Sequence, residues 1–167
     1  MLIEKYEKNI IISPEFYGTT IHALNEPNFL ILGGEKKLCS KVADLYHRFV
    51  KSDFHIHFTD SKTAELVKYM ENSWLATKVT FCSEFYHIAK EIGVDYNELR
   101  ELMCLDHRFG NSHSYIDPEK PYYDSHCLNK DIPAILKFCE DNITHSPMLL
   151  NIVKVINEID KKFPERK

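Results

Sequence analysis

A stretch of about thirty residues limits most strongly what this chain can fold into. The sequence "DSKTAELVKYMENSWLATKVTFCSEFYHIAKEIG" runs from Asp60 to Gly93 and has helical spacing throughout. Asp60 or Ser61 can cap its start and Gly93 can end it. At a rise of 1.5 Å per residue, roughly thirty residues form a rod of about 45 Å. The sequence therefore predicts one long central helix.

Apolar side chains of this helix cover more than one of its faces. Leu66, Met70 and Trp74 share a face because they are four residues apart. Further apolar positions widen the surface: Val67, Leu75, Val79, Cys82, Phe85 and Tyr86. A helix that is apolar on so much of its circumference is buried on several sides. In a chain of 167 residues a partner subunit would supply the cover, so we expect a homodimer.

The residues before the long helix indicate a small α/β unit, 1–60. Apolar runs at Asn9–Ser13 and Asn28–Gly34 predict buried strands, and the alternating run Phe54–Phe58 predicts a third. Between the second and third runs lie four apolar residues at helical spacing: Leu38, Val42, Leu45 and Phe49. Three short strands and one helix make a poor free-standing sheet. We therefore interpret this unit as the residual end of a larger α/β domain.

Residues 61–167 are predicted to form a helical domain. After the long helix, Asp95 with Glu98 has the pattern of a capping box, and this next helix would reach about Leu105. The predicted fold class is therefore α+β and mostly α, with a small residual α/β unit followed by a helical dimerisation domain.

A long polar and aromatic loop, Asp106–Lys130, comes next, and loops of this length are usually functional or disordered. Asp131 would cap the helix after the loop. Ser146 and Pro147 would begin the last helix, with proline at its favoured first position.

The overall composition excludes several classes of protein. The net charge of −4 argues against a nucleic-acid groove, and no apolar run approaches the roughly 20 residues of a membrane span. The N-terminus has no signal-peptide core. The cysteines are odd in number and have no tight spacing, which fits reduced thiols in the cytoplasm. They are Cys39, Cys82, Cys104, Cys127 and Cys139.

The stretch "SHCLNKD" holds the strongest candidate for a nucleophile. Cys127 lies four residues before the helix start predicted at Asp131, and both that helix terminus and Lys130 would favour its thiolate form. The alternative is that Cys127 is an ordinary small apolar residue. Lys68 and Asn72, four residues apart, share a face of the long helix, although a lysine there can also extend to solvent.

Neither a zinc site nor a nucleotide fingerprint is predicted. Histidines and other possible ligands surround the long loop without the tight spacing of zinc ligands. They are His107, His113, Asp124, His126 and Cys127. No GxGxxG and no P-loop motif occurs in the sequence. We therefore expect no metal, and the sequence indicates no residues that would bind a dinucleotide.

Four blocks in the same order resemble the nucleotide-sugar 6-dehydrogenases, the family of UDP-glucose and GDP-mannose dehydrogenases. "SPEF" with "NEPNFLILGG" resembles the end of the family's N-terminal domain, and "TAELVKYMENSWLATKVTFCSEFYHIAKEIGVDYNEL" resembles the opening of its central domain. "LDHRFGN" resembles its arginine motif, and "SHCLNKD" resembles its catalytic segment. The resemblance covers nearly the whole chain.

The resemblance implies a role for individual residues. Cys127 matches the family's catalytic thiol. In the family, a first hydride transfer from the sugar C6 alcohol to NAD gives an aldehyde, and the thiol adds to it. A second hydride transfer gives a thioester, which water hydrolyses to the uronic acid. Lys68 and Asn72 match groups that polarise the C6 oxygen. Asp131 matches a residue that orients water or the lysine, and Glu15 matches a carboxylate implicated in hydrolysing the thioester. Arg108 matches an arginine that reaches the substrate of the neighbouring subunit. Phe16 and Lys130 match residues that bind the substrate.

The sequence also departs from the family pattern. Asp124 and Ser125 replace two glycines before the cysteine, and His126 replaces a serine. Side chains there would crowd the sugar pocket, and Asp124 would add negative charge near an anionic substrate. A second carboxylate of the family has no match.

The resemblance implies the middle third of such an enzyme, without the first part of the NAD domain or the C-terminal nucleotide-binding domain. A truncated or split dehydrogenase would need an NAD-binding companion chain, because the isolated chain is not expected to bind NAD tightly. The alternative is a non-catalytic dimerisation or interaction module that keeps the fold. A third possibility, a metal-binding protein that uses the histidine-rich loop, would require stoichiometric metal.

Overall fold

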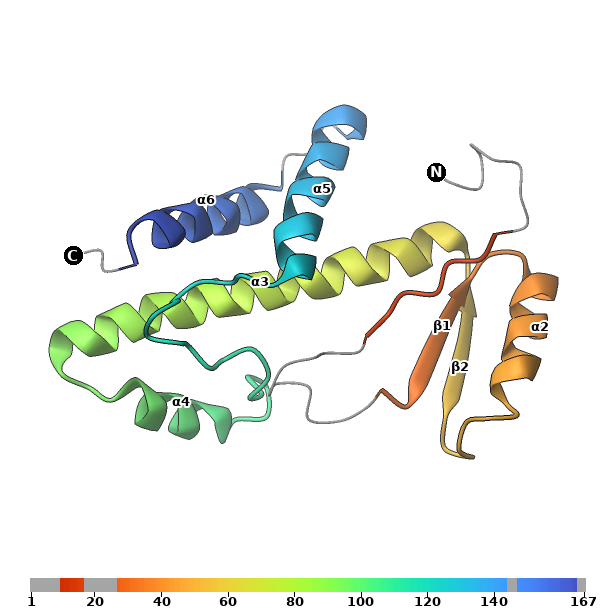
Figure 1. Cartoon of the computed structure of the whole chain (residues 1–167), viewed down its shortest axis with the longest axis horizontal. Coiled ribbons are helices and arrows are strands. Elements are labelled where there is room, and N and C mark those ends of the chain that lie inside the picture. The colour runs from red at the N-terminus through yellow and green to blue at the C-terminus, as the bar shows by residue number, and fades with distance from the viewer. Residues whose placement is uncertain (1–9, 17–26, 144–146, 165–167) are drawn as a thin grey trace. The chain divides into compact units, whose positions relative to one another are not determined.

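The computed structural model describes residues 10–16, 27–143 and 147–164. The chain divides into two compact units, Met1–Met70 and Glu71–Lys167. Five helices and two strands lie within the described ranges, which confirms the predicted mostly helical α+β class (Figure 1).

The first unit contains a two-stranded parallel sheet. Strand β1 (Phe29–Gly33) pairs with β2 (His55–Thr59), and helix α2 (Lys36–Tyr46) connects them. A small core forms between α2 and the sheet, and its buried members are Leu32, Cys39 and Ala43. The strands predicted at Asn28–Gly34 and Phe54–Phe58 are therefore confirmed to within one residue.

One prediction for this unit was wrong, and its helix is shorter than the apolar spacing indicates. In the described part of the segment predicted as a strand at Asn9–Ser13, only Ile12 forms a bridge, and it pairs antiparallel with Gly33. Helix α2 ends at Tyr46, and Phe49 beyond it is 81% exposed. Cys39 and Ala43, one turn apart, face the core instead of Phe49. The apolar periodicity extended beyond the residues that the small sheet can cover.

Helix α3 (Ser61–Ile92) is the predicted long helix. The Asp60 carboxylate accepts hydrogen bonds from the backbone N–H and the hydroxyl of Thr63, at 3.0 and 2.6 Å. Gly93 ends the helix with φ of 74°, a left-handed conformation that costs glycine little. Both predicted ends are confirmed.

Three further helices follow α3 in the second unit. Helix α4 (Tyr96–Cys104) has the predicted N-cap, since the Asp95 carboxylate accepts a 2.8 Å bond from the backbone N–H of Asn97. Helix α5 (His126–Asn142) and helix α6 (Met148–Lys162) follow.

The start of α5 differs from the prediction. Ser125 is the N-cap, and its hydroxyl accepts a 3.2 Å bond from the backbone N–H of Leu128. Asp131 lies in the second turn, so it does not cap the helix. Cys127 lies in the first turn, not in the preceding loop. The loop predicted to extend to Lys130 therefore ends at Ser125.

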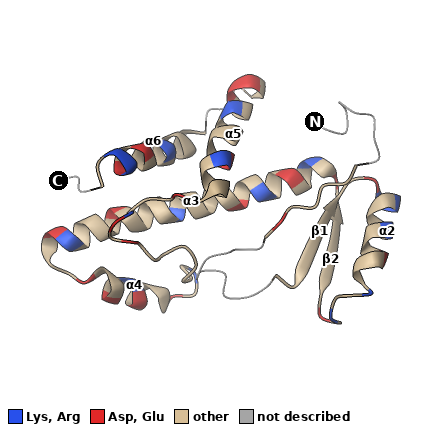
Figure 2. Ribbon diagram, in the orientation of Figure 1, with Lys and Arg blue, Asp and Glu red and all other residues tan. Residues whose placement is uncertain are grey.

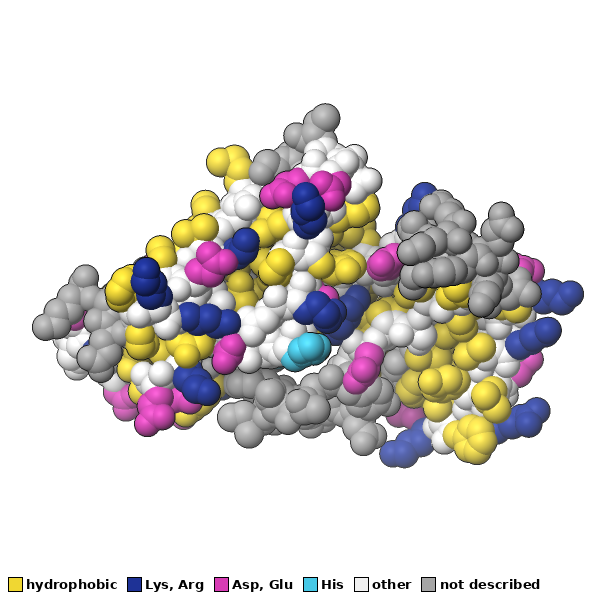
Figure 3. All heavy atoms as spheres, turned by 45° about the horizontal axis from the view of Figure 1, so that its top comes forward, with side chains coloured by type: hydrophobic (Ala, Val, Ile, Leu, Met, Phe, Trp, Pro, Cys, Tyr) yellow, Lys and Arg dark blue, Asp and Glu magenta, His cyan; other side chains and the backbone are white. Residues whose placement is uncertain are grey.

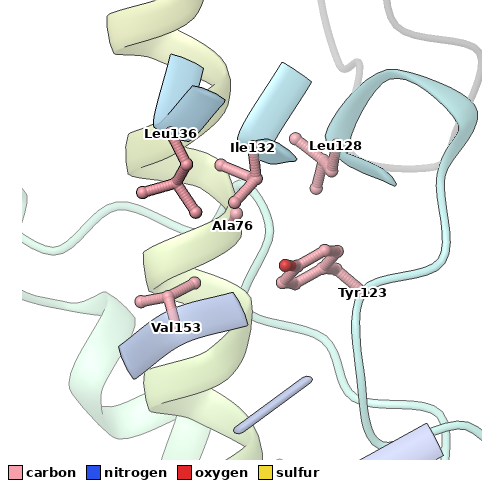
Figure 4. Packing of buried hydrophobic residues seen from close by; sticks show 6 residues of the cluster. All are labelled: Ala76, Tyr123, Leu128, Ile132, Leu136 and Val153. Carbon is pink, nitrogen blue, oxygen red and sulfur yellow. The ribbon is translucent and has the colours of Figure 1, made fainter. Parts of the chain in front are cut away.

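The core of the second unit joins three helices to the segment before α5. Its buried residues come from α3, from that segment, from α5 and from α6 (Figure 4). They are Ala76, Tyr123, Leu128, Ile132, Leu136 and Val153. Because Tyr123 belongs to this core, the residues before Cys127 are held against it.

Each helix of the described ranges carries charged side chains of both signs (Figure 2). None of the helices within the described ranges combines the length and apolar character needed to cross a bilayer.

Candidate functional site

A buried polar pair connects α3 to α5. The side-chain amide of Asn72 donates a 2.5 Å hydrogen bond to one carboxylate oxygen of Asp131. Asn72 is 3% exposed and Asp131 is 4% exposed. The ammonium of Lys130 pairs with the other carboxylate oxygen. Three residues predicted for the site are thus brought into direct contact.

Cys127 lies one helical turn before Asp131 and is exposed at the start of α5. Backbone N–H groups at the start of a helix lack intrahelical partners and carry partial positive charge, so the side chain of Cys127 lies beside donors that attract an anion. The other four cysteines differ: Cys39, Cys82 and Cys139 are buried and Cys104 is partly buried. Burial raises the pKa of the Cys39 and Cys82 thiols.

We expect Cys127 to be alkylated by iodoacetamide at pH 7 at least about tenfold faster than any buried cysteine, because it is accessible and lies at a helix N-terminus. Timed labelling followed by peptide mass mapping measures all five rates in one sample. Cys104 is the comparison of intermediate exposure. Labelling of Cys127 no faster than Cys39 would contradict the placement of this thiol.

Helix α6 holds the segment that leads to Cys127. The backbone N–H of Tyr123 donates a 3.0 Å bond to the side-chain oxygen of Asn157. The ammonium of Lys161 lies 3.0 Å from the Asp124 carboxylate. Asn129 donates a 3.0 Å bond to that carboxylate and accepts a 2.8 Å bond from Lys161. The hydrogen bond from Asn129, with that from Lys161, lowers the pKa of Asp124.

The sequence did not predict this second set of residues. The one signal available was that Asn157 and Lys161 are four residues apart on the last predicted helix. They therefore share a face, but nothing in the spacing indicated which segment they contact.

Arg108 lies on an exposed loop, and a buried lysine donates hydrogen bonds to the backbone of this loop. The Arg108 side chain is 92% exposed and bonds the Asp106 carboxylate, which lowers the pKa of Asp106. Lys78 of α3 is buried and donates to the carbonyl oxygens of Phe109 and Gly110 at 2.9 and 2.8 Å. Burial lowers the pKa of Lys78. Sequence reasoning missed Lys78 as the anchor of the arginine loop.

The remaining predicted residues lie in the first unit. The ammonium of Lys68 is 5.1 Å from the centre of the Phe16 ring, and that ring is 5.0 Å from the ring of Phe29. Glu15 is exposed. The structure therefore brings Lys68 and Phe16 together within this unit.

Glycine turns are the candidates for binding the phosphates of NAD. The best candidate is the Gly33–Gly34 turn after β1, where a dinucleotide domain would place its phosphates on backbone N–H groups. A Cβ on Gly33 would collide with the Cβ of Ala64 and approach the carbonyl oxygen of Asp60 to 2.7 Å. The backbone N–H of Gly34 donates to Thr59 instead. This glycine pair allows close packing of the chain on itself.

Across the described ranges, no three histidine, cysteine, aspartate or glutamate side chains gather in a way that could hold a metal ion.

Comparison with known proteins decides the family. Residues 62–159 match the model of the UDP-glucose/GDP-mannose dehydrogenase family, central domain. The chain belongs to this family. The family resemblance seen in the sequence is thereby confirmed.

Several relatives illustrate the match. The chain is 35% identical over 129 residues to GDP-mannose 6-dehydrogenase of Azotobacter vinelandii, covering 75% of this chain and 29% of that protein. It is 32% identical over 155 residues to the enzyme of the same name from Pseudomonas aeruginosa, covering 90% and 35%. A UDP-glucose dehydrogenase from the archaeon Pyrobaculum islandicum has a similar structure, with a TM-score of 0.76 and 27% identity over 92% of this chain and 34% of that one. The chain thus spans about a third of the length of these dehydrogenases.

Proposed function

We propose that this chain supplies the sugar-oxidising centre of a nucleotide-sugar 6-dehydrogenase, which converts a C6 alcohol to a uronic acid with NAD as oxidant. The observation that carries the proposal is the buried Asn72–Asp131 pair, one helical turn from the exposed thiol of Cys127. The family match over residues 62–159 includes all three residues and supports the proposal.

Cys127 acts as the nucleophile in this proposal. Its thiolate attacks the C6 carbon at the aldehyde stage, and a carbon–sulfur bond forms as the carbonyl π pair moves onto oxygen. The resulting alkoxide takes up a proton to give a thiohemiacetal. This addition changes no oxidation state.

Asn72 stabilises the oxygen of that adduct. Its amide has two N–H groups, and one of them is oriented by Asp131. The second donates to the developing oxyanion, and a donor fixed in advance by a buried carboxylate needs little reorganisation. By resemblance, Lys68 adds positive charge at the same oxygen, Glu15 serves thioester hydrolysis, and three residues contact substrate: Phe16, Lys130 and Arg108.

The hydride acceptor comes from a second chain in this proposal. NAD supplies the acceptor in two successive transfers, and the sequence of this chain contains no dinucleotide fingerprint. We therefore assign the NAD site to a companion chain with a dinucleotide-binding domain. The five cysteines, none of them in a disulfide, support a location in the cytoplasm.

A non-catalytic dimerisation module is the second candidate. The residues Asp124, Ser125 and His126 favour it, because they replace the two glycines and the serine of the family's catalytic segment. In that case Cys127 would keep its place in the fold without meeting a sugar.

The isolated chain is expected to produce no NADH from UDP-glucose or GDP-mannose with NAD, because its sequence contains no dinucleotide fingerprint. Absorbance at 340 nm, about the maximum of NADH, measures this against a Cys127→Ser control. NADH formation above that control would disprove the need for a companion chain.

The same preparation separates the two candidate functions. If the sugar-oxidising centre is present, millimolar UDP-glucose or GDP-mannose slows alkylation of Cys127 and leaves Cys104 unchanged. A non-catalytic module shows no such protection with either nucleotide sugar.

We also propose that the chain forms a homodimer through α3. Several large apolar residues of this helix in the second unit are exposed: Trp74, Phe81, Phe85, Ile88 and Ile92. Figure 3 shows apolar side chains reaching the surface between charged ones. Apolar patches this extended are rare on soluble monomers.

We expect light scattering at tens of micromolar protein to give twice the chain mass of 19.6 kDa. The double variant Phe81→Glu/Ile88→Glu places two charges on the exposed apolar face and should shift the mass to that of a monomer. Lys90→Glu, an exposed change on the same helix, serves as the control. A monomeric wild-type chain would refute the dimer.

A further inference from the structure

Two residues one turn apart on α6 hold two successive residues of the cysteine segment. Asn157 accepts a bond from the backbone N–H of Tyr123, and Lys161 pairs with the carboxylate of Asp124. Asn157 is 4% exposed, so the first contact is buried, whereas the Lys161 and Asp124 side chains are 32% and 48% exposed. The first contact fixes the backbone, and the second acts on a charge at the protein surface.

The charge of Asp124 lies where it can oppose an anion. Asp124 immediately precedes the N-cap of α5, and Cys127 is in the first turn of that helix. The unpaired N–H groups of a first turn attract negative charge, and a carboxylate beside them reduces this attraction. A carboxylate at this position would therefore weaken the attraction of an anionic ligand to this turn.

The ammonium of Lys161 offsets this charge. It reaches Asp124 Oδ1 and also donates to the side-chain oxygen of Asn129, which in turn donates to Asp124. The three side chains form a closed set with a net charge of zero. One carboxylate oxygen of Asp124 thus contacts both α5 and α6.

We propose that Lys161 is a positioning residue that compensates the charge of Asp124, so that the first turn of α5 still accepts an anionic substrate at Cys127. This proposal rests on the proposed function, because it takes a nucleotide sugar to be the anionic substrate. Where the family pattern has glycine and therefore no charge, this chain has a charge and its counter-charge.

The test compares two alkylating reagents on the whole chain. Iodoacetate is an anion and iodoacetamide is neutral, so the ratio of their rates at Cys127 reports the local potential and cancels changes in accessibility. Replacing Lys161 with methionine removes the ammonium that pairs with the Asp124 carboxylate. The ratio is expected to fall about two- to fivefold at low ionic strength and to recover in about 0.5 M salt, because salt screens exposed charges.

Matched variants separate this effect from others. Lys162→Met makes the same change in net charge one residue away, at an exposed position, and should leave the ratio nearly unchanged. Lys161→Arg should keep the wild-type ratio. The double variant Asp124→Asn/Lys161→Met should restore the ratio, because it removes the charge that needs compensation. Asp124→Asn alone should give a ratio at or above that of the wild type.

A Lys161→Met ratio equal to that of the wild type, or an equal fall in Lys162→Met, would overturn the proposal. So would a ratio below wild type in Asp124→Asn, a variant that does not depend on the stability of Lys161→Met. No nucleotide sugar or NAD enters these measurements. Failure of nucleotide sugars to protect Cys127 would thus count against the proposed function alone.

Discussion

Replacing Ile132 with alanine is expected to lower the free energy of unfolding of the second unit by about 3–4 kcal/mol. Ile132 is 0% exposed at the centre of the core that joins α3, α5 and α6 (Figure 4). The substitution removes three buried carbon atoms and leaves a cavity that close-packed neighbours fill only in part. Urea unfolding followed by circular dichroism measures the change.

Ile143→Ala provides the matched control. Ile143 is the residue that follows α5 and is 49% exposed, so the same truncation should cost less than about 1 kcal/mol. The α5 face with Leu128, Ile132 and Leu136 is assigned to the core. Equal losses of unfolding free energy in the two variants would contradict this assignment.

Asp131→Ala is expected to destabilise the unit by about 3 kcal/mol, because it leaves a buried amide without its acceptor. Asn72 is 3% exposed, so water cannot readily replace the lost carboxylate. The lost ion pair with Lys130 adds little, since that ammonium is 58% exposed.

The control for this substitution lies on the same helix. Asp141 is 53% exposed and pairs with Lys137 one turn before it, at 2.9 Å. Asp141→Ala should cost no more than about 0.5 kcal/mol. If Asp131→Ala were equally mild, the buried pair would not be the structural link between α3 and α5.

The sequence predicted the elements whose ends are set by local chemistry. Asp60 and Gly93 bound α3, and Asp95 begins α4, because capping depends on residues within one turn of the helix end. These interactions are independent of the rest of the fold, so they can be inferred from neighbouring residues alone.

The predicted start of α5 was wrong because tertiary packing outweighs a local preference. Aspartate is a favoured N-cap residue, and this preference predicted a start at Asp131. The buried residues Leu128, Ile132 and Leu136 continue one face on both sides of this position, and their burial stabilises the earlier turn. This four-residue spacing was present in the sequence and would have placed Cys127 inside the helix.

The candidate site was predicted in part. Asn72, Lys130 and Asp131 were found through the family pattern, and the structure brings them into contact. Lys78 and Lys161 were not found, because each acts on a loop distant in sequence. Such contacts depend on how the helices pack, and the spacing of residues within one helix carries no information about them.

Cys127 is proposed to be the reacting thiol of a nucleotide-sugar site. The most direct measurement is the alkylation rate of Cys127 in the presence of the C6 aldehyde of UDP-glucose or GDP-mannose, with propionaldehyde as the reference. We expect the nucleotide-sugar aldehyde to protect Cys127 reversibly and to leave Cys104 unprotected. Its effective concentration should be at least about tenfold below that of propionaldehyde, because binding of the rest of the molecule holds the aldehyde at the thiol. Equal protection by the two aldehydes would contradict this role of Cys127.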